Sequence, residues 1–186
     1  FARSPSIGEP FSMPIGSEIS PCSKCVSMSS GDSATANLPG DSSAIRLTRS
    51  ISCSATSLER ALQRTADYLR QRIVFGKPLL KSQYIQFKLA DMAMEIECAR
   101  LLLYKACWLR DNDLPFSKEA AMAKLYCSEL MYRCANHSVQ LHGGYGLMKE
   151  YDVERFYRDQ KLLDIGEGTS EVQRVVIARH IGAKCL

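Results

Sequence analysis

The sequence predicts an all-α protein: an antiparallel, up-and-down bundle of four to five helices that follows an irregular N-terminal tail. Apolar residues recur at steps of three and four from about residue 57 onward. Capping residues, glycines and prolines mark the ends of these periodic segments. No segment in this part alternates apolar and polar residues as a half-buried strand would. Helices joined by short loops are typical of an antiparallel bundle.

Composition limits the class of protein. The 186 residues are 46% hydrophobic and 24% charged, with a net charge of +4. A chain of this kind can form one globular core, which excludes a collagen or a wholly disordered protein. The small positive charge gives no reason to expect a nucleic-acid partner. No apolar run approaches the roughly 18 residues of a transmembrane helix, so we expect no membrane span.

Residues 1–56 form a segment rich in serine and proline, without sustained apolar periodicity. Such a segment cannot bury enough surface to offset the entropy of ordering, so we expect an irregular tail without assignable chemistry. Cys22 and Cys25 form a single C-x-x-C pair, which is weak evidence for zinc or redox chemistry. The chain begins with Phe1 rather than Met, so we expect it to be part of a longer or processed protein.

The first two helices are predicted from residue 57 to about Gly76 and from Ser82 to about Asp111. Thr56 and Glu59 have the spacing of a capping box for the first helix. Gly76 and Pro78 should end it. The second helix has the clearest amphipathic pattern of the chain, with an apolar face made of Ile85, Leu89, Met92, Ile96, Ala99 and Leu103.

Three further helices complete the predicted bundle. Ser117 should open the third, and Gly143-Gly144 should close it. Asp152 should start a short fourth helix that is interrupted at residues 166–168. Ser170 and Gln173 have capping-box spacing for a fifth helix that continues to about residue 183.

The cysteines of the bundle are predicted to be free and buried. Cys98, Cys107, Cys127 and Cys134 fall within helical patterns beside apolar neighbours. A buried free cysteine behaves as a small hydrophobic residue. Their scattered placement therefore indicates a reducing compartment rather than a disulfide framework.

Three stretches differ from a plain bundle. In Arg72–Leu79 an arginine at a helix end precedes Phe75 and Gly76; it could bind phosphate oxygens or simply be solvated. Gln140–Gly146 is glycine-rich, but it closes a helix instead of following a strand, so a dinucleotide-binding fold is excluded by context. The nearby histidines His137 and His142 are interpreted as packing and capping residues, without metal-ligand spacing.

The third stretch, Ile165–Gln173, places Glu167 between two glycines directly before a helix. Desolvation in such a turn would favour the neutral carboxyl group and make it a useful general base. A carboxylate that only interacts with the helix dipole, worth about 0.3–1 kcal/mol, is an equally good interpretation of the spacing.

Taken in order, these stretches resemble the C-terminal helical, FAD-binding domain of the acyl-CoA dehydrogenase family over about residues 57–186. The matching segments are Arg72-x-x-Phe-Gly-Lys-Pro-Leu, Gln86-Phe-Lys-Leu-Ala-Asp-Met, Lys118-Glu-Ala-Ala-Met-Ala-Lys, Gln140-x-x-Gly-Gly-x-Gly, Arg155-x-x-Arg-Asp and Glu167-Gly-Thr-Ser-Glu-x-Gln-Arg. The family's N-terminal and middle domains have no counterpart in residues 1–56.

The resemblance implies α,β-dehydrogenation of a short- or medium-chain acyl-CoA to trans-2-enoyl-CoA, a reaction of fatty-acid β-oxidation. Glu167 matches the family's catalytic base, FAD N5 would accept the hydride, and Gly168 matches a substrate-binding position. Gly166 stands where many members have Tyr, which leaves the chain-length preference open. The remaining implied FAD-binding residues are Arg72, Phe75, Gln83, Gln140, Gly143, Gly144, Thr169 and Glu171.

The resemblance also implies an electron acceptor, an oligomeric state and a cellular location. Electron-transferring flavoprotein would be the electron acceptor, and a homo-oligomer, usually a tetramer, would complete the site, since some family contacts cross subunits. We expect little activity from this chain alone, and exposed faces where the other domains would pack. The location would be the mitochondrial matrix in a eukaryote and the cytoplasm in a bacterium. A catalytically incomplete oligomerisation module and an acyl-CoA oxidase relative remain as alternatives.

Overall fold

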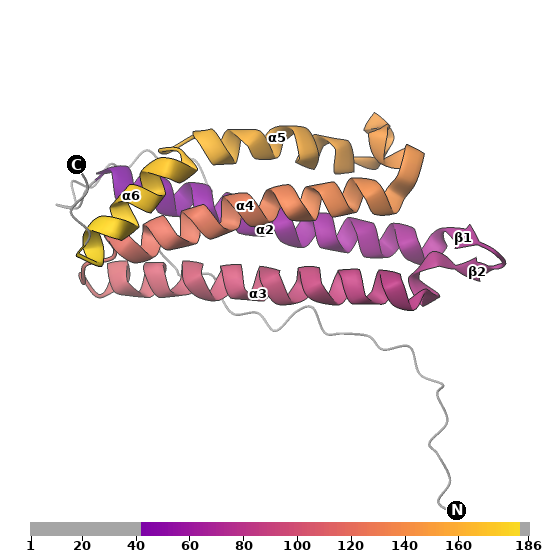
Figure 1. Ribbon diagram of the computed structural model, residues 1–186, viewed down its shortest axis with the longest axis horizontal. Coiled ribbons are helices and arrows are strands. Elements are labelled where there is room, and N and C mark those ends of the chain that lie inside the picture. Colours follow the sequence, from indigo (N-terminus) through magenta and orange to yellow (C-terminus); the bar gives the residue numbers. More distant parts are fainter. Residues whose placement is uncertain (1–41, 183–186) are drawn as a thin grey trace, which may run out of the picture. The chain divides into compact units, whose positions relative to one another are not determined.

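The computed structural model describes residues 42–182, which form the predicted helical bundle (Figure 1). The α-helices of this part, labelled as in Figure 1, are α2 (Ser42–Gln71), α3 (Gln83–Asp111), α4 (Ser117–His142), α5 (Val153–Ile165) and α6 (Ser170–His180). Helices α2 to α5 lie side by side, and α6 crosses the start of α4. None of these five helices combines the length and hydrophobicity that crossing a bilayer requires.

Helix α4 is the centre of the bundle and contacts α2, α3, α5 and α6. Its buried face contains small residues that let its neighbours approach closely, namely Ala120, Ala121, Ala123, Cys127, Cys134 and Ala135. Larger buried side chains fill the space between the helices: Leu58, Leu69, Met92, Leu130, Met131 and Val153. This arrangement gives one continuous apolar core, the dominant stabilising contribution in a domain of this size.

The first helix begins earlier than the sequence predicts. Helix α2 starts at Ser42, so the prediction that residues 42–56 are irregular is wrong. Ile51 and Ser54 are buried on the same face as Leu58, and this packing overrides the low helix propensity of a serine-rich segment. Thr56 lies inside the helix, so it is not the N-cap residue. The rest of the predicted tail, residues 1–41 with Cys22 and Cys25, lies outside the described residues.

A short hairpin joins α2 to α3, although no strand was expected. Strand β1 (Ile73–Val74) pairs antiparallel with β2 (Lys77–Pro78). Phe75 at φ 51° and Gly76 at φ 74° form the turn. Positive φ at both central positions is the geometry that two-residue hairpins prefer. The sequence signal for a helix end at Gly76 and Pro78 therefore came from this hairpin, and α2 itself ends at Gln71.

The later helix ends agree closely with the predictions. Gly143 ends α4 with φ 62°, a conformation that glycine adopts without strain. Asp152 precedes α5 but makes no side-chain capping bond. At α6 the N-cap is Thr169 rather than Ser170, because the Thr169 hydroxyl accepts from Val172 N. The expected end of α6 near residue 183 is three residues too late, since the helix ends at His180.

The cysteine prediction is confirmed at three of four positions. Cys107, Cys127 and Cys134 are free and buried, and burial raises the pKa of Cys127 and of Cys134 to about 12. Cys98 is free but exposed, so its predicted burial is wrong. Cys98 lies on the outer face of α3. The apolar periodicity of the sequence identifies the buried face of this helix, but it did not show that Cys98 lies outside that face.

Candidate functional site

The predicted site residues fall into two groups at opposite ends of the bundle (Figure 1). One group surrounds Arg72 and the Gly143–Gly144 turn, near the hairpin. The other surrounds Glu167, between α5 and α6. Lys124 contacts the second group and His142 belongs to the first. The two residues are 18 positions apart on α4, roughly 27 Å along the helix. A single copy therefore does not bring Glu167 and Arg72 together.

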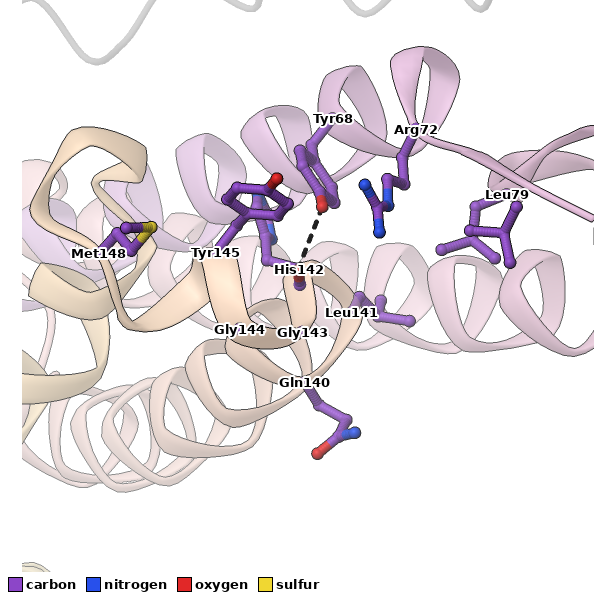
Figure 2. A pocket seen from close by; sticks show the side chains of 11 residues that line it. Tyr68, Arg72, Leu79, Gln140, Leu141, His142, Gly143, Gly144, Tyr145 and Met148 are labelled. Atoms are coloured by element: carbon purple, nitrogen blue, oxygen red, sulfur yellow. Dashed lines mark hydrogen bonds between the residues drawn. The ribbon is translucent and has the colours of Figure 1, made fainter.

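An open cavity of about 500 Å³ lies at the hairpin end (Figure 2). Its lining residues are Tyr68, Arg72, Val74, Leu79, Gln140, Leu141, His142, Gly143, Gly144, Tyr145 and Met148. The Arg72 guanidinium lies 5.4 Å from the centre of the Tyr145 ring, a cation–π arrangement that orients it. The cavity thus presents one oriented, permanently charged cation among apolar and aromatic side chains.

Tyr68 and His142 fix the backbone that leads into the glycine turn. Their rings stack at 4.2 Å, and Tyr68 Oη donates to the His142 carbonyl at 3.1 Å. His142 Nδ1 is 2.7 Å from the Ser138 carbonyl oxygen, which assigns the proton of the neutral ring to Nδ1. Burial lowers the pKa of His142 and raises that of Tyr68, so both groups are neutral near pH 7. Sequence analysis missed Tyr68, which has no distinguishing motif.

The glycines of this turn differ in their structural roles. A Cβ added at Gly146 would lie 2.6 Å from the Val139 carbonyl oxygen, so internal packing requires that glycine. Among residues 42–182, a Cβ at Gly143 or Gly144 would meet no atom within 4 Å. Packing against this described part of the chain therefore gives no reason for glycine at 144, and its bare backbone leaves room for another molecule to approach closely.

The other predicted cofactor contacts at this end lie on the edge of the cavity or outside it. Gln140 lines the rim, with its side chain directed away from Arg72 in Figure 2. Phe75 is fully exposed at the hairpin tip, and Gln83 is exposed at the start of α3. These exposed side chains are available for contacts with other chains or with ligands.

The second group is a tightly held turn that presents a carboxylate. Glu167 has φ 60°, a left-handed conformation that costs a non-glycine residue about 1 kcal/mol. Gln173 Nε2 stabilises it by donating to the carbonyl oxygens of Glu167 at 3.1 Å and Gly168 at 3.2 Å. The Glu167 side chain itself is exposed. The backbone of the turn is thus fixed while the carboxylate stays accessible.

Lys124 anchors the same turn from α4. It is 3% exposed, and its Nζ donates to the carbonyl oxygens of Gly168 at 2.8 Å and Asp164 at 3.1 Å. Burial lowers the pKa of Lys124, and the nearby carboxylates of Asp164, Glu171 and Glu167 oppose that shift. A lysine at a core position of the helical period, beside Ala120 and Ala123, is the signal that could have revealed this residue.

Thr169 and Glu171 shape the start of α6. The Thr169 hydroxyl lies 3.5 Å from Val172 N at the helix N-cap. A hydrogen bond from Thr169 lowers the pKa of Glu171, which is exposed in the first helical turn. Glu171 therefore remains ionised at neutral pH and interacts favourably with the positive end of the helix dipole.

Fold and site together define a helical domain that offers a cation-bearing cavity at one end and a fixed, exposed carboxylate at the other. Residues 44–182 match the family model described as acyl-CoA dehydrogenase, C-terminal domain. The chain belongs to the acyl-CoA dehydrogenase family. The match begins at residue 44, within α2, which agrees with the early start of that helix.

Individual relatives agree with this assignment. A probable acyl-CoA dehydrogenase, YngJ, of Bacillus subtilis is 56% identical over 123 residues, which are 66% of this chain and 32% of that protein. The human mitochondrial short-chain specific acyl-CoA dehydrogenase is 50% identical over the same length, 66% of this chain and 30% of the relative. The chain thus spans about a third of the curated relatives that it matches.

Solved structures show the same fold. Butyryl-CoA dehydrogenase from Megasphaera elsdenii has a TM-score of 0.72 and 41% identity, covering 75% of this chain and 37% of that one. PigA, solved with FAD and proline, has a TM-score of 0.75 and 29% identity, covering 78% of this chain and 38% of that one.

Proposed function

We propose that this chain is the helical, flavin-facing part of an enzyme that dehydrogenates a short- or medium-chain acyl-CoA to the trans-2-enoyl-CoA. Glu167 is the general base that removes the proton from the carbon α to the thioester. The substrate class is supported by the 50% identity to a short-chain specific enzyme and the 41% identity to a butyryl-CoA dehydrogenase. Gly168 would lie beside the acyl group.

The observation that carries the proposal is the exposed Glu167 side chain on a fixed backbone. Two hydrogen bonds from Gln173 and one from Lys124 hold the carbonyl groups of the turn, but none of these three bonds uses the carboxylate. A base must reach a weakly acidic C–H bond from a set direction.

The hairpin end fits the phosphate-bearing part of FAD. Arg72 would bind pyrophosphate oxygens, and the open backbone at Gly143 and Gly144 would allow close approach of the nucleotide. Phe75, Gln83 and Gln140 would add contacts from the rim, and Thr169 and Glu171 would lie beside the flavin at the other end. When bound, FAD supplies the hydride acceptor for the reaction.

A complete site requires more than one copy. Because Arg72 and Glu167 lie at opposite ends of the bundle, the two groups would serve different flavins, each shared between neighbouring subunits. A homodimer or homotetramer therefore belongs to the proposed function. Electron-transferring flavoprotein would reoxidise the flavin. A mitochondrial enzyme and a bacterial one are both among the relatives, so either compartment is compatible with the proposal.

The decisive experiment restores the rest of the enzyme. Residues 44–182 replace the corresponding domain of the Megasphaera butyryl-CoA dehydrogenase, and butyryl-CoA-dependent reduction of an artificial acceptor is measured. We expect turnover, and a loss of roughly 10²–10⁴ in kcat on Glu167→Gln, as for a missing general base. The matched control is Glu97→Gln, which removes an exposed carboxylate of α3. Near-normal turnover of the Glu167→Gln chimera would exclude Glu167 as the base.

Cofactor binding is tested separately in the same chimera. Arg72→Ala should weaken FAD binding by about 1.5–3 kcal/mol, the range for hydrogen bonds to charged groups. The measurement is a fluorescence titration of the apoprotein with FAD. Arg70→Ala, at an exposed arginine in the last turn of α2, is the control. Equal FAD affinity of the two variants would contradict the assignment of Arg72.

A further inference from the structure

The turn between α5 and α6 is held from two sides by buried polar side chains. Lys124 comes from α4 and is 3% exposed, and Gln173 comes from α6 and is 4% exposed. Lys124 Nζ lies 2.8 Å from the Gly168 carbonyl oxygen, and Gln173 Nε2 lies 3.2 Å from the same oxygen. Lys124 Nζ also donates to the Asp164 carbonyl oxygen at 3.1 Å. Two helices that are far apart in the sequence thus fix the same peptide group.

These bonds also determine which way the amide groups of the turn point. Gln173 Nε2 donates to the Glu167 carbonyl oxygen at 3.1 Å as well as to that of Gly168. The peptide bonds of residues 42–182 are trans, and a trans peptide directs its N–H opposite to its C=O. The N–H groups of Gly168 and Thr169 therefore point away from the buried donors. The turn keeps these two carbonyl groups inside and has the Glu167 side chain on its exposed surface.

The conformation of this turn depends on that support. Glu167 has φ 60° and Gly168 has φ 93°, so two successive residues lie in the left-handed region. Such a backbone persists at a non-glycine residue only where the surroundings enforce it. A Cβ at residue 168 would lie 2.9 Å from Gln173 Nε2, so glycine is required for Gln173 to pack beneath the turn. Without the bonds from Lys124 and Gln173, an exposed turn of this kind would sample other conformations.

We propose that Lys124 and Gln173 are positioning residues for the Glu167 base. This inference rests on the proposed function, because it concerns the direction from which Glu167 meets the C–H bond of the substrate. A misplacement of about 1 Å can lower a rate roughly a hundredfold. Neither side chain has to touch the substrate, since both act through the Glu167 and Gly168 peptide groups. Loss of either should therefore lower kcat and leave KM almost unchanged.

The butyryl-CoA dehydrogenase chimera tests this inference. Lys124→Met and Gln173→Met each keep the apolar part of the side chain and remove its hydrogen bonds to the turn. Each should lower kcat at least tenfold, with KM and the Kd for FAD within twofold of the unmodified chimera. Lys118→Met, on the same helix as Lys124, is the control and should change none of the three. Expressing kcat per bound FAD removes the contribution of unfolded molecules. If one variant does not fold, the other decides.

The Glu167→Gln background separates positioning from general structural support. If Lys124 acts through the base, Lys124→Met should lower kcat less than twofold once residue 167 is glutamine, because the two substitutions then remove the same contribution. Gln173→Met should behave in the same way. Equal fold losses with and without the Glu167 carboxylate would overturn the inference, because they would mean that the two side chains support the whole domain. A kcat within twofold of the unmodified chimera for the single variants would equally overturn it.

A second readout needs neither FAD nor substrate. In the 186-residue chain, the backbone ¹⁵N order parameters of Glu167, Gly168 and Thr169 should be about 0.85 and should fall below about 0.6 in Lys124→Met and in Gln173→Met. Order parameters that remain high in both variants would overturn this inference and leave the proposed function intact. Turnover of the chimera that does not depend on Glu167 would instead overturn the proposed function and this inference together.

Discussion

Replacing Lys124 by methionine should loosen the turn that carries Glu167. Methionine keeps the buried apolar stem but removes both hydrogen bonds of Nζ. The Gly168 carbonyl keeps a bond from Gln173, whereas the Asp164 carbonyl loses the Lys124 bond. Loss of the bond to the part-buried Asp164 carbonyl costs up to about 1–3 kcal/mol. Removal of the desolvated ammonium group offsets part of the loss of the two bonds. We expect a net loss of about 2 kcal/mol in the free energy of unfolding.

The assay is urea unfolding of the 186-residue chain, followed by circular dichroism at 222 nm. With a slope of about 2 kcal/mol/M, a loss of this size lowers the midpoint by about 1 M. Lys118→Met on the same helix is the control, because its ion pair with Glu119 is partly exposed and should contribute less than about 0.5 kcal/mol. Amide exchange at the start of α6 should accelerate only in the Lys124 variant. Equal midpoints for the two variants would refute the anchoring role of Lys124.

Two further predictions concern titratable groups. Because burial lowers the pKa of His142, the unfolded chain binds more protons below pH 6.5, and stability should fall as the pH drops from 6.5 through the folded pKa. His142→Phe should reduce the pH dependence of the free energy of unfolding, measured at pH 5 to 7. His137→Gln should reduce it less, although burial also lowers the pKa of this half-buried histidine. An identical pH dependence in both variants would contradict the role of His142. Cys98 should react with a thiol reagent at pH 8 at least a hundredfold faster than Cys127, whose pKa is about 12, and comparable rates by mass spectrometry would contradict the burial of Cys127.

The sequence predicted the helix ends well where local chemistry decides them. Gly143 ends α4 because its positive φ is accessible to glycine, and this depends little on the rest of the fold. The start of α2 depends instead on tertiary packing. Ile51 and Ser54 are buried only because the rest of the bundle is present, so a serine-rich composition led to the wrong expectation for residues 42–56.

The candidate site was predictable in its residues but not in its arrangement. Glu167 between two glycines has a visible local pattern, and its left-handed φ agrees with that pattern. The support from Lys124 comes from a residue 43 positions earlier in the chain, and no local pattern shows which carbonyl groups it reaches. The separation of Arg72 from Glu167 likewise follows from the lengths and directions of the packed helices, which only the folded chain shows.

The distance between the cation-bearing cavity and the carboxylate turn has a consequence for mixtures of defective copies. Under the proposed function, a copy with Arg72→Ala still contributes an unaltered Glu167 carboxylate, and a copy with Glu167→Gln still contributes an unaltered Arg72 guanidinium. Neither variant alone would form an intact catalytic centre, but an assembly of both would contain some. Two chimeras that each carry one of these variants, dissociated and reassembled together, would thus regain part of the lost turnover, a form of complementation within one polypeptide species.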